Sequence, residues 1–255
     1  MTLVWLLWCG LLRLLSVHGL GFATRIVGGE ETSIEHVPYQ VYLRERGDFI
    51  CGGSLLSVSF VLSAAHCVYG AKPQDYSVHA GASRLEQPAA VVRNVAQFHI
   101  ASNYNSRNFD MDVALLQLAQ PMELLPGRVV SIALCRRPPP SNTYVRISGW
   151  GVTQEQNREP AAQVRTALVR VLSRTECQLA YAGQAQLSDS MLCAAVRGIR
   201  DSCSGDSGGP LVYRGQVCGI VSWGFGCARA AYPGVYTSVA SERVQRFIAQ
   251  TLGHS

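Results

Sequence analysis

The segment Asp201-Ser-Cys-Ser-Gly-Asp-Ser-Gly-Gly-Pro210 places the strongest constraint on how this chain can fold. It holds a candidate nucleophile, Ser207, together with two acids, Asp201 and Asp206, one cysteine and three glycines. A serine hydroxyl is a poor nucleophile near neutral pH unless a base removes its proton. If Ser207 is to react, the fold must bring it a base, a group that orients the base, and donors that stabilise negative charge.

Cysteine content indicates an oxidising environment. The chain has nine cysteines, and eight of them follow the apolar N-terminal stretch that contains Cys9. An even set of this kind predicts disulfides in a secreted protein, although eight cysteines allow roughly a hundred pairings. With 255 residues, 48% of them hydrophobic, the chain can build a sizeable core as one large domain or two packed halves.

The charge balance argues against a nucleic-acid partner. The formal net charge is +5, and Arg13 and Arg25 account for two of these charges, which leaves +3 for the rest of the chain. This excess is too small to indicate nucleic-acid binding. The 24 glycines and 11 prolines favour many short strands joined by turns.

The N-terminus resembles a secretory signal. Met1–Leu15 is apolar, and the small residues that follow predict a signal peptide over 1–19, cleaved after about Gly19 or Gly21. Arg13 interrupts the apolar run and the first residues lack a cation, so a signal anchor is the alternative, although the run is short for a bilayer span. We expect a secreted, extracellular protein with no membrane contact after signal removal.

Short strands are expected along most of the chain. Tyr39, Val41 and Leu43 alternate with Gln40, Tyr42 and Arg44, which is the period of a strand. Apolar residues at i, i+4 and i+8 predict a helix over Ser241–Leu252. Further strands are expected within 50–56, 60–63, 113–118, 145–149, 169–172, 219–224 and 234–237, and a short helix within 174–181.

Two residues could serve Ser207. His66 lies among small residues, where a lone histidine is more often structural, but a Cys51–Cys67 bridge would hold it against the preceding strand. Asp112 leads directly into an apolar run and must be paired if it is buried. We favour it over Asp110 because it adjoins the strand, while a solvated turn aspartate is the alternative.

Three motifs in this order carry a family resemblance: Leu62-Ser-Ala-Ala-His-Cys67, Asp112-Val-Ala-Leu-Leu116 and Gly205-Asp-Ser-Gly-Gly-Pro210. With them, the chain resembles the chymotrypsin-like, trypsin-type serine proteases from about residue 26 to 252. The resemblance implies an all-β fold of two packed six-stranded antiparallel β-barrels, with the active site between them and a C-terminal α-helix. Further motifs in register are Arg25-Ile-Val-Gly-Gly29, Ser148-Gly-Trp-Gly151, Ser222-Trp-Gly224 and Pro233-Gly-Val-Tyr236.

The resemblance also assigns the catalytic roles. It implies that Ser207 attacks the scissile carbonyl, that His66 acts as general base and then general acid, and that Asp112 orients His66. The backbone N–H groups of Gly205 and Ser207 would form the oxyanion hole. Ser222 resembles the family serine that supports the aspartate.

The same resemblance implies synthesis as an inactive zymogen. Residues 20–25 would be an activation peptide, and 26–255 the protease domain. Cleavage after Arg25, by a trypsin-like protease or by the enzyme itself, would free the amine of Ile26. This amine would pair with Asp206 and order the oxyanion hole and substrate pocket.

The resemblance implies a substrate preference through Asp201, which matches the acidic residue at the bottom of the S1 pocket in trypsin-like members. Asp201 there would bind guanidinium or ammonium groups, which predicts cleavage after Arg and Lys. Gly224 and Gly234 match the open pocket walls, and Ser202 would add an acceptor useful for Lys. The expected partners are polypeptide substrates, an activating protease and protein protease inhibitors.

The cysteines depart from the family pattern at one point. Val145 and Tyr213 stand where many members carry a pair of disulfide-bonded cysteines. Because both cysteines are replaced, neither position leaves an unpaired thiol. We expect the two remaining cysteines, Cys135 and Cys218, to bond to each other, with free thiols or an intermolecular bridge as alternatives. The three pairs that match the family are Cys51–Cys67, Cys177–Cys193 and Cys203–Cys227.

No metal or cofactor is expected. The stretch that corresponds to the calcium loop of trypsins, Gly81–Ala90, has only Glu86, with Ala82 in the place of the first glutamate. Calcium requires about six or more oxygen ligands. The sequence also lacks an N-glycosylation sequon.

The sequence disfavours two other functional classes. A catalytically inactive homologue that acts as a binding module would be signalled by loss of a catalytic residue, but His66, Asp112 and Ser207 are all present. A protease that acts mainly by binding polyanions is disfavoured by the scattered arginines and the small net charge.

Overall fold

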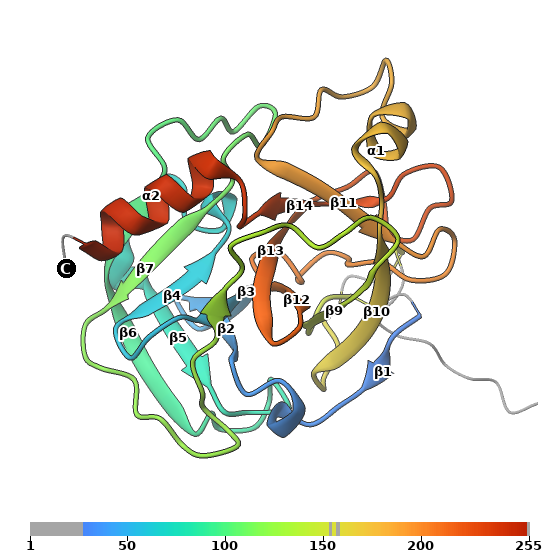
Figure 1. The fold of residues 1–255 in the computed structure, drawn as a ribbon. Coiled ribbons are helices and arrows are strands. Elements are labelled where there is room, and N and C mark those ends of the chain that lie inside the picture. Colours follow the sequence, from blue (N-terminus) through green and yellow to red (C-terminus); the bar gives the residue numbers. More distant parts are fainter. Residues whose placement is uncertain (1–27, 153–154, 157–158, 254–255) are drawn as a thin grey trace, which may run out of the picture.

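The computed structural model describes residues 28–152, 155–156 and 159–253, which form two β-barrels and a C-terminal helix (Figure 1). The proposed signal and activation segments, 1–19 and 20–25, lie outside the described residues. The strands of the first half are β1 (Glu30–Glu31), β2 (Gln40–Glu45), β3 (Asp48–Leu55), β4 (Phe60–Ser63), β5 (Tyr76–Ala80), β6 (Val91–Ile100) and β7 (Ala114–Leu118). Those of the second half are β8 (Ala133–Leu134), β9 (Tyr144–Gly149), β10 (Arg165–Val171), β11 (Met191–Ala195), β12 (Pro210–Tyr213), β13 (Gln216–Trp223) and β14 (Gly234–Ser238).

Each barrel closes through six antiparallel strands. The first runs β2-β3-β4-β7-β6-β5 and returns to β2. The second runs β9-β10-β11-β14-β13-β12 and closes because β12 also pairs with β9. The two short strands are additions: β1 extends the sheet at β10, and β8 pairs in parallel with β13. The predicted fold of two six-stranded barrels with a C-terminal helix is therefore confirmed.

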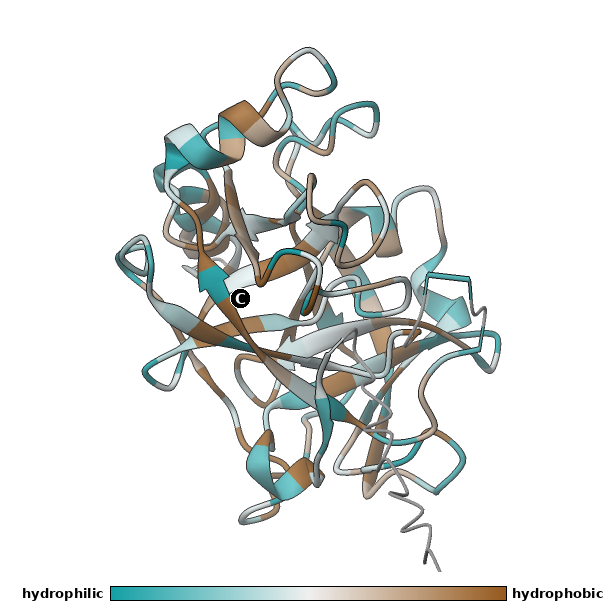
Figure 2. Ribbon diagram, turned by 90° about the vertical axis from the view of Figure 1, so that its right-hand side faces the viewer, coloured by the Kyte–Doolittle hydropathy of each residue, from teal (hydrophilic) through white to brown (hydrophobic). Residues whose placement is uncertain are grey.

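Residues on both faces of β2 are buried where the barrels meet. Gln40, Val41, Tyr42 and Leu43 are all buried, although the alternation of the sequence is typical of a strand with one exposed face. The Ser148 hydroxyl on β9 donates a 2.7 Å hydrogen bond to Gln40 Oε1, so the polar side chain is satisfied across the interface. Figure 2 shows brown, hydrophobic segments along the strands and teal segments mainly in the connecting loops.

The C-terminal helix α2 (Glu242–Gly253) begins and ends one residue later than predicted. Its buried residues Val244 and Ile248 pack in a cluster that also contains Leu55 of the first barrel and Val217 of the second. The helix therefore packs against residues of both barrels, and it lies beside β7 in Figure 1. Within the described ranges, no helix has the length and apolar character needed to cross a membrane.

The shorter helix α1 (Arg174–Ala180) is capped in the way its sequence favours. Ser173 accepts a hydrogen bond from the Glu176 backbone N–H, and the Glu176 carboxylate accepts one from the Ser173 N–H. A reciprocal capping box of this kind satisfies two N–H groups that have no partner within the helix. The helix carries Cys177, which it presents to Cys193 on β11.

Four disulfides join the expected pairs of cysteines. In many members of the family that this chain resembles, a further disulfide joins the positions of Val145 and Tyr213. Here Val145 is buried in a hydrophobic cluster of the second barrel, and Tyr213 packs against that cluster. Apolar contact there takes the place of the covalent bond. The pairs are Cys51–Cys67, Cys135–Cys218, Cys177–Cys193 and Cys203–Cys227.

We predict that the Cys135–Cys218 bond contributes to stability and not to catalysis. It joins the segment after β8 to β13 across 83 residues of sequence. Replacing both cysteines by alanine should lower the free energy of unfolding by about 2–5 kcal/mol. Denaturant unfolding measures this loss, and kcat/KM measured well below the transition should stay at the wild-type value. An unchanged unfolding midpoint would show that the bond contributes nothing.

Candidate active site

The Asp112 carboxylate is the buried centre of a hydrogen-bond network between the barrels. Asp112 is 0% exposed and lies two residues before β7. Its Oδ1 accepts from the His66 backbone N–H at 2.9 Å, and its Oδ2 lies 2.8 Å from His66 Nδ1. Ser222 on β13 donates its hydroxyl to Oδ2 at 2.5 Å, and Thr237 on β14 donates to the Asp112 carbonyl at 2.8 Å. Donors from both barrels therefore hold this aspartate.

His66 lies in the short 3-10 helix Ala65–Cys67. The Cys51–Cys67 bond fixes this turn to β3. The His66 and Phe109 rings pack edge to face, with 5.7 Å between their centroids. The His66 side chain is partly exposed, and its Nε2 lies 3.8 Å from Cys67 Sγ. Among the described residues no hydrogen bond joins His66 Nε2 to Ser207 Oγ, and such contacts often tighten only when substrate is bound.

The turn before Asp112 has strained backbone geometry. Phe109 and Met111 have φ values of 57° and 56°, although neither is glycine. Left-handed conformations cost non-glycine residues about 1–2 kcal/mol each, and they persist where surrounding contacts determine them. The side chain of Phe109 thereby reaches both His66 and the cavity wall.

The segment 201–210 presents two backbone donors beside Ser207. The Cys203–Cys227 disulfide joins this segment to the loop after β13. Gly205 has φ of 91°, a conformation that favours glycine. Within the described part of the chain, the N–H groups of Gly205 and Ser207 donate to no protein acceptor. Two such donors beside a hydroxyl can stabilise an oxyanion.

A cavity of about 430 Å³ opens next to Ser207 and ends on Asp201. The Asp201 carboxylate is 1% exposed and accepts hydrogen bonds from the backbone N–H groups of Ser202, at 2.8 Å, and Ala228, at 3.2 Å. Burial raises the pKa of Asp201 to about 7, against the lowering effect of these two donors. A Cβ on Gly234 would lie 2.4 Å from Asp201 Oδ1, so only glycine leaves the acid open to the cavity.

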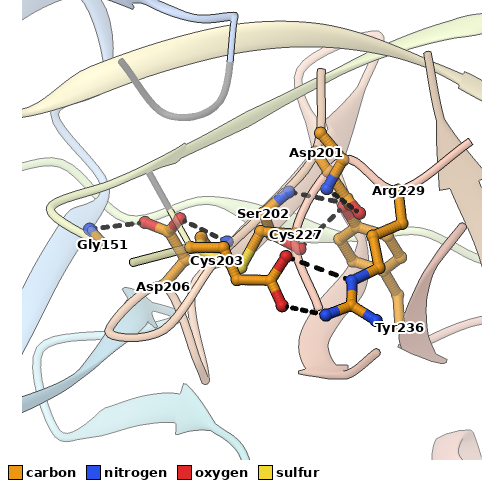
Figure 3. Close-up of a disulfide and its surroundings, with 10 residues drawn as sticks. Gly151, Asp201, Ser202, Cys203, Asp206, Cys227, Arg229 and Tyr236 are labelled. Carbon is orange, nitrogen blue, oxygen red and sulfur yellow. Dashed lines mark hydrogen bonds and ion pairs between the residues drawn. A yellow bond between two sulfur atoms is a disulfide. The ribbon is translucent and has the colours of Figure 1, made fainter. Parts of the chain in front are cut away.

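Asp206 points toward Gly151, which follows β9 of the second barrel (Figure 3), and it is not among the residues that line the cavity. Its oxygens accept hydrogen bonds from the backbone N–H groups of Gly151, at 2.8 Å, and Cys203, at 3.0 Å. A Cβ on Gly151 would lie 2.4 Å from the carboxyl carbon, which explains glycine in the Ser-Gly-Trp-Gly motif. Burial raises the pKa of Asp206 to about 6, against the effect of these two donors.

Neither of these two buried acids has a cationic partner among the described residues. The predicted partner of Asp206, the amine of Ile26, lies outside the described residues, as does Arg25. A buried carboxylate without a cation favours its neutral form. A cation placed beside either carboxyl group would favour its ionised form.

The groups near the site do not fit a metal centre. Cys51, His66 and Cys67 offer ligand atoms within 4.8 Å of one another, but the two cysteines form a disulfide and cannot supply thiolates. In the loop that resembles the calcium loop, the Leu85 carbonyl accepts a 2.9 Å hydrogen bond from the Arg44 guanidinium. A cationic side chain thus already occupies one oxygen of that loop.

Several site contacts were missed by the sequence analysis. Thr237 supports Asp112, and the Tyr236 hydroxyl lies 3.2 Å from the Ser202 hydroxyl. Glu155 lines the cavity and forms an ion pair with Arg229, with oxygen to nitrogen distances of 2.5 and 3.1 Å. Thr237 and Tyr236 lie in a predicted strand, and the sequence alone does not show which groups their hydroxyls face. The pairing of β14 with its neighbouring strands determines this.

Comparisons with known proteins agree with this arrangement. The trypsin family model matches residues 26–248. Seminase of Drosophila melanogaster is 40% identical over 220 residues, covering 86% of this chain and 79% of the relative. Trypsin alpha-4 of Lucilia cuprina is 38% identical, covering 86% of this chain and 85% of the relative.

A solved structure gives the same result in three dimensions. The chain superposes on neuropsin, a serine protease expressed in mouse brain, with a TM-score of 0.78 and 34% sequence identity. The superposition covers 88% of this chain and 98% of neuropsin. The network around Asp112, the cavity beside Ser207 and the matched length lead to one conclusion: the chain belongs to the trypsin family of chymotrypsin-like serine proteases.

Proposed function

We propose that this serine protease is a secreted endopeptidase that is made as a zymogen and cleaves after Arg and Lys. The observation that carries the proposal is the pair of buried carboxyl groups, Asp201 and Asp206, each with backbone donors and neither with a cation among the described residues. One faces the substrate cavity and the other faces the protein interior. A cationic substrate side chain and a new N-terminal ammonium are the cations that complete them.

In the proposed reaction, Ser207 Oγ attacks the scissile carbonyl while His66 Nε2 accepts its proton. The arrangement of Asp112 supports this role, because its 2.8 Å contact with Nδ1 sets the tautomer that leaves Nε2 free as the base. The N–H groups of Gly205 and Ser207 stabilise the tetrahedral oxyanion, and such donors contribute about 3 kcal/mol each. His66 then returns the proton to the leaving amine, and water repeats the sequence to release the acid.

Specificity for basic residues rests on Asp201. An arginine side chain in the cavity can form a bidentate pair with a carboxylate, and a shorter lysine can use the Ser202 hydroxyl as an additional acceptor. The bound cation favours ionised Asp201, which burial alone disfavours. The cavity therefore selects cationic side chains over apolar ones of similar volume.

Secretion follows in this proposal from the signal at 1–19 and from the four disulfides, which form and persist outside the reducing cytosol. Polypeptides are the substrates, a trypsin-like enzyme or this enzyme itself is the activator, and protein inhibitors of the family are expected partners. No metal or cofactor takes part in any step of the proposed mechanism.

We predict that substitution at Asp201 abolishes the basic preference. Peptide-library profiling of the activated wild type should show cleavage after Arg and Lys, and Asp201→Ser should lower kcat/KM for Arg substrates by about 100-fold or more, because the substrate cation loses its buried partner. Gly234→Ala, which leaves the acid in place but fills the space before it, should also impair Arg substrates. Equal turnover of Phe and Arg substrates by the wild type would refute the assignment.

Activation should depend on Arg25. The full-length chain should be inactive until it is cut after this residue, since Asp206 has no cation among the described residues before cleavage. An Arg25→Gln chain should resist a trypsin-like activator and stay inactive, as measured by N-terminal sequencing and a peptide assay in parallel. Full activity of the uncleaved Arg25→Gln protein would exclude the proposed activation.

Asp206 should make the uncleaved chain less stable as pH rises. Its folded pKa, about 6, lies above the unfolded value of roughly 4. The folded state therefore holds the proton more tightly, and this group's stabilising effect is lost between about pH 4 and 6. Two units correspond to about 3 kcal/mol. Denaturant unfolding across this range should show a steeper decline for wild type than for Asp206→Asn, and parallel curves would contradict the assignment.

A further inference from the structure

Arg243, in the first turn of α2, reaches an acid that lies two residues before Asp112. Its guanidinium contacts both oxygens of Asp110, at 3.1 and 2.9 Å. It also contacts the Asp189 carboxylate at 2.8 Å. Asp110 belongs to the loop between β6 and β7 of the first barrel, whereas Asp189 precedes β11 of the second. The guanidinium therefore joins the helix to both barrels.

The second barrel also holds the Asp110 turn through Ser190. The Ser190 hydroxyl, which is completely buried, donates to Asp110 Oδ1 at 2.8 Å and accepts from the Met111 backbone N–H at 3.1 Å. The Ser190 carbonyl in turn accepts from the Ser238 N–H at the end of β14. Ser190 and Arg243 thus both donate hydrogen bonds to the Asp110 carboxylate.

These contacts act on the two residues with unfavourable backbone geometry. Phe109 and Met111, on either side of Asp110, both have positive φ. A turn in this conformation persists only when contacts with other segments stabilise it. Asp110 makes such contacts through its side chain, which is only 19% exposed. The next residue along the chain is Asp112, whose carboxylate must remain within hydrogen-bond reach of His66.

We infer that the Arg243–Asp110 ion pair positions the catalytic aspartate: it holds the strained turn that aims Asp112 at His66. The inference rests on the proposed role of Asp112 and adds two positioning residues to it, one of them on the C-terminal helix, more than a hundred residues away in sequence. Neither residue lines the substrate cavity, so the pair acts on the chemical step and not on substrate affinity.

The test measures kcat and KM separately on the full chain after activation by a trypsin-like protease, with an Arg-containing peptide substrate. Arg243→Gln and Asp110→Asn should each lower kcat roughly 10- to 100-fold, since small displacements of a catalytic group have effects of this size. KM and the inhibition constant of benzamidine, a small amidine that probes the Asp201 pocket, should stay within about twofold. The double variant should be no worse than the more severe single variant.

Two controls separate positioning from general destabilisation. Asp189→Asn removes the more exposed partner of the same guanidinium and leaves the Asp110 contacts in place, so kcat should be unchanged. Arg246→Gln breaks an exposed pair with Glu242 on the same helix and should also be silent. Arg243→Lys, which keeps one charged contact, should recover part of the lost kcat, and this also provides a readable variant if Arg243→Gln folds poorly.

A pH profile gives a readout that a purely structural role would not move. If Asp112 is displaced, the His66 imidazolium loses stabilisation, and the acid limb of the kcat profile should move to lower pH in Arg243→Gln. Unchanged kcat in Arg243→Gln and Asp110→Asn, or equal losses in the two control variants, would overturn the inference. An inactive wild type, or a Ser207→Ala variant as active as wild type, would instead overturn the proposed function.

Discussion

The complete burial of the Asp112 carboxylate is the constraint on which the rest of the structure depends. A buried carboxylate is tolerated only when hydrogen bonds and charge compensate for lost water. Its partners come from the His66 turn of the first barrel and from β13 and β14 of the second. Neither barrel alone could satisfy it, so the two six-stranded units must pack against each other for the site to exist.

The same physical rule explains how the three buried acids differ. Asp112 has a complete set of partners within the protein, whereas Asp201 and Asp206 have backbone donors and no cation among the described residues. Burial raises the pKa of each of the latter two, to about 7 and about 6. In the proposed function, the acid with a full set of partners orients the catalytic base, and the two acids without a cation receive one later.

Much of this arrangement could be predicted from local motifs, because each motif carries its own chemistry. The barrels and the cysteine pairs follow from motif order and family resemblance, and the helix near the C-terminus follows from its apolar residues at i, i+4 and i+8. Contacts between distant segments could not be predicted: the burial of Gln40 depends on Ser148, and the role of Arg243 depends on Asp110. The two-residue strands β1 and β8 were also missed, because they are too short to show a hydrophobic period and are defined only by pairing with a neighbouring strand.

The Cys203–Cys227 disulfide, drawn in Figure 3, joins the segment that carries both Asp201 and Asp206 to the loop after β13. Asp201 binds the backbone of Ala228, next to one half of this bond, and Asp206 binds the N–H of Cys203, which is the other half. A ligand at either acid therefore acts on one covalently closed unit. For the activation and specificity proposed above, thermodynamic reciprocity has a consequence. If insertion of the new N-terminus raised the affinity of the cavity for a basic side chain by some factor, occupation of the cavity would strengthen insertion by the same factor.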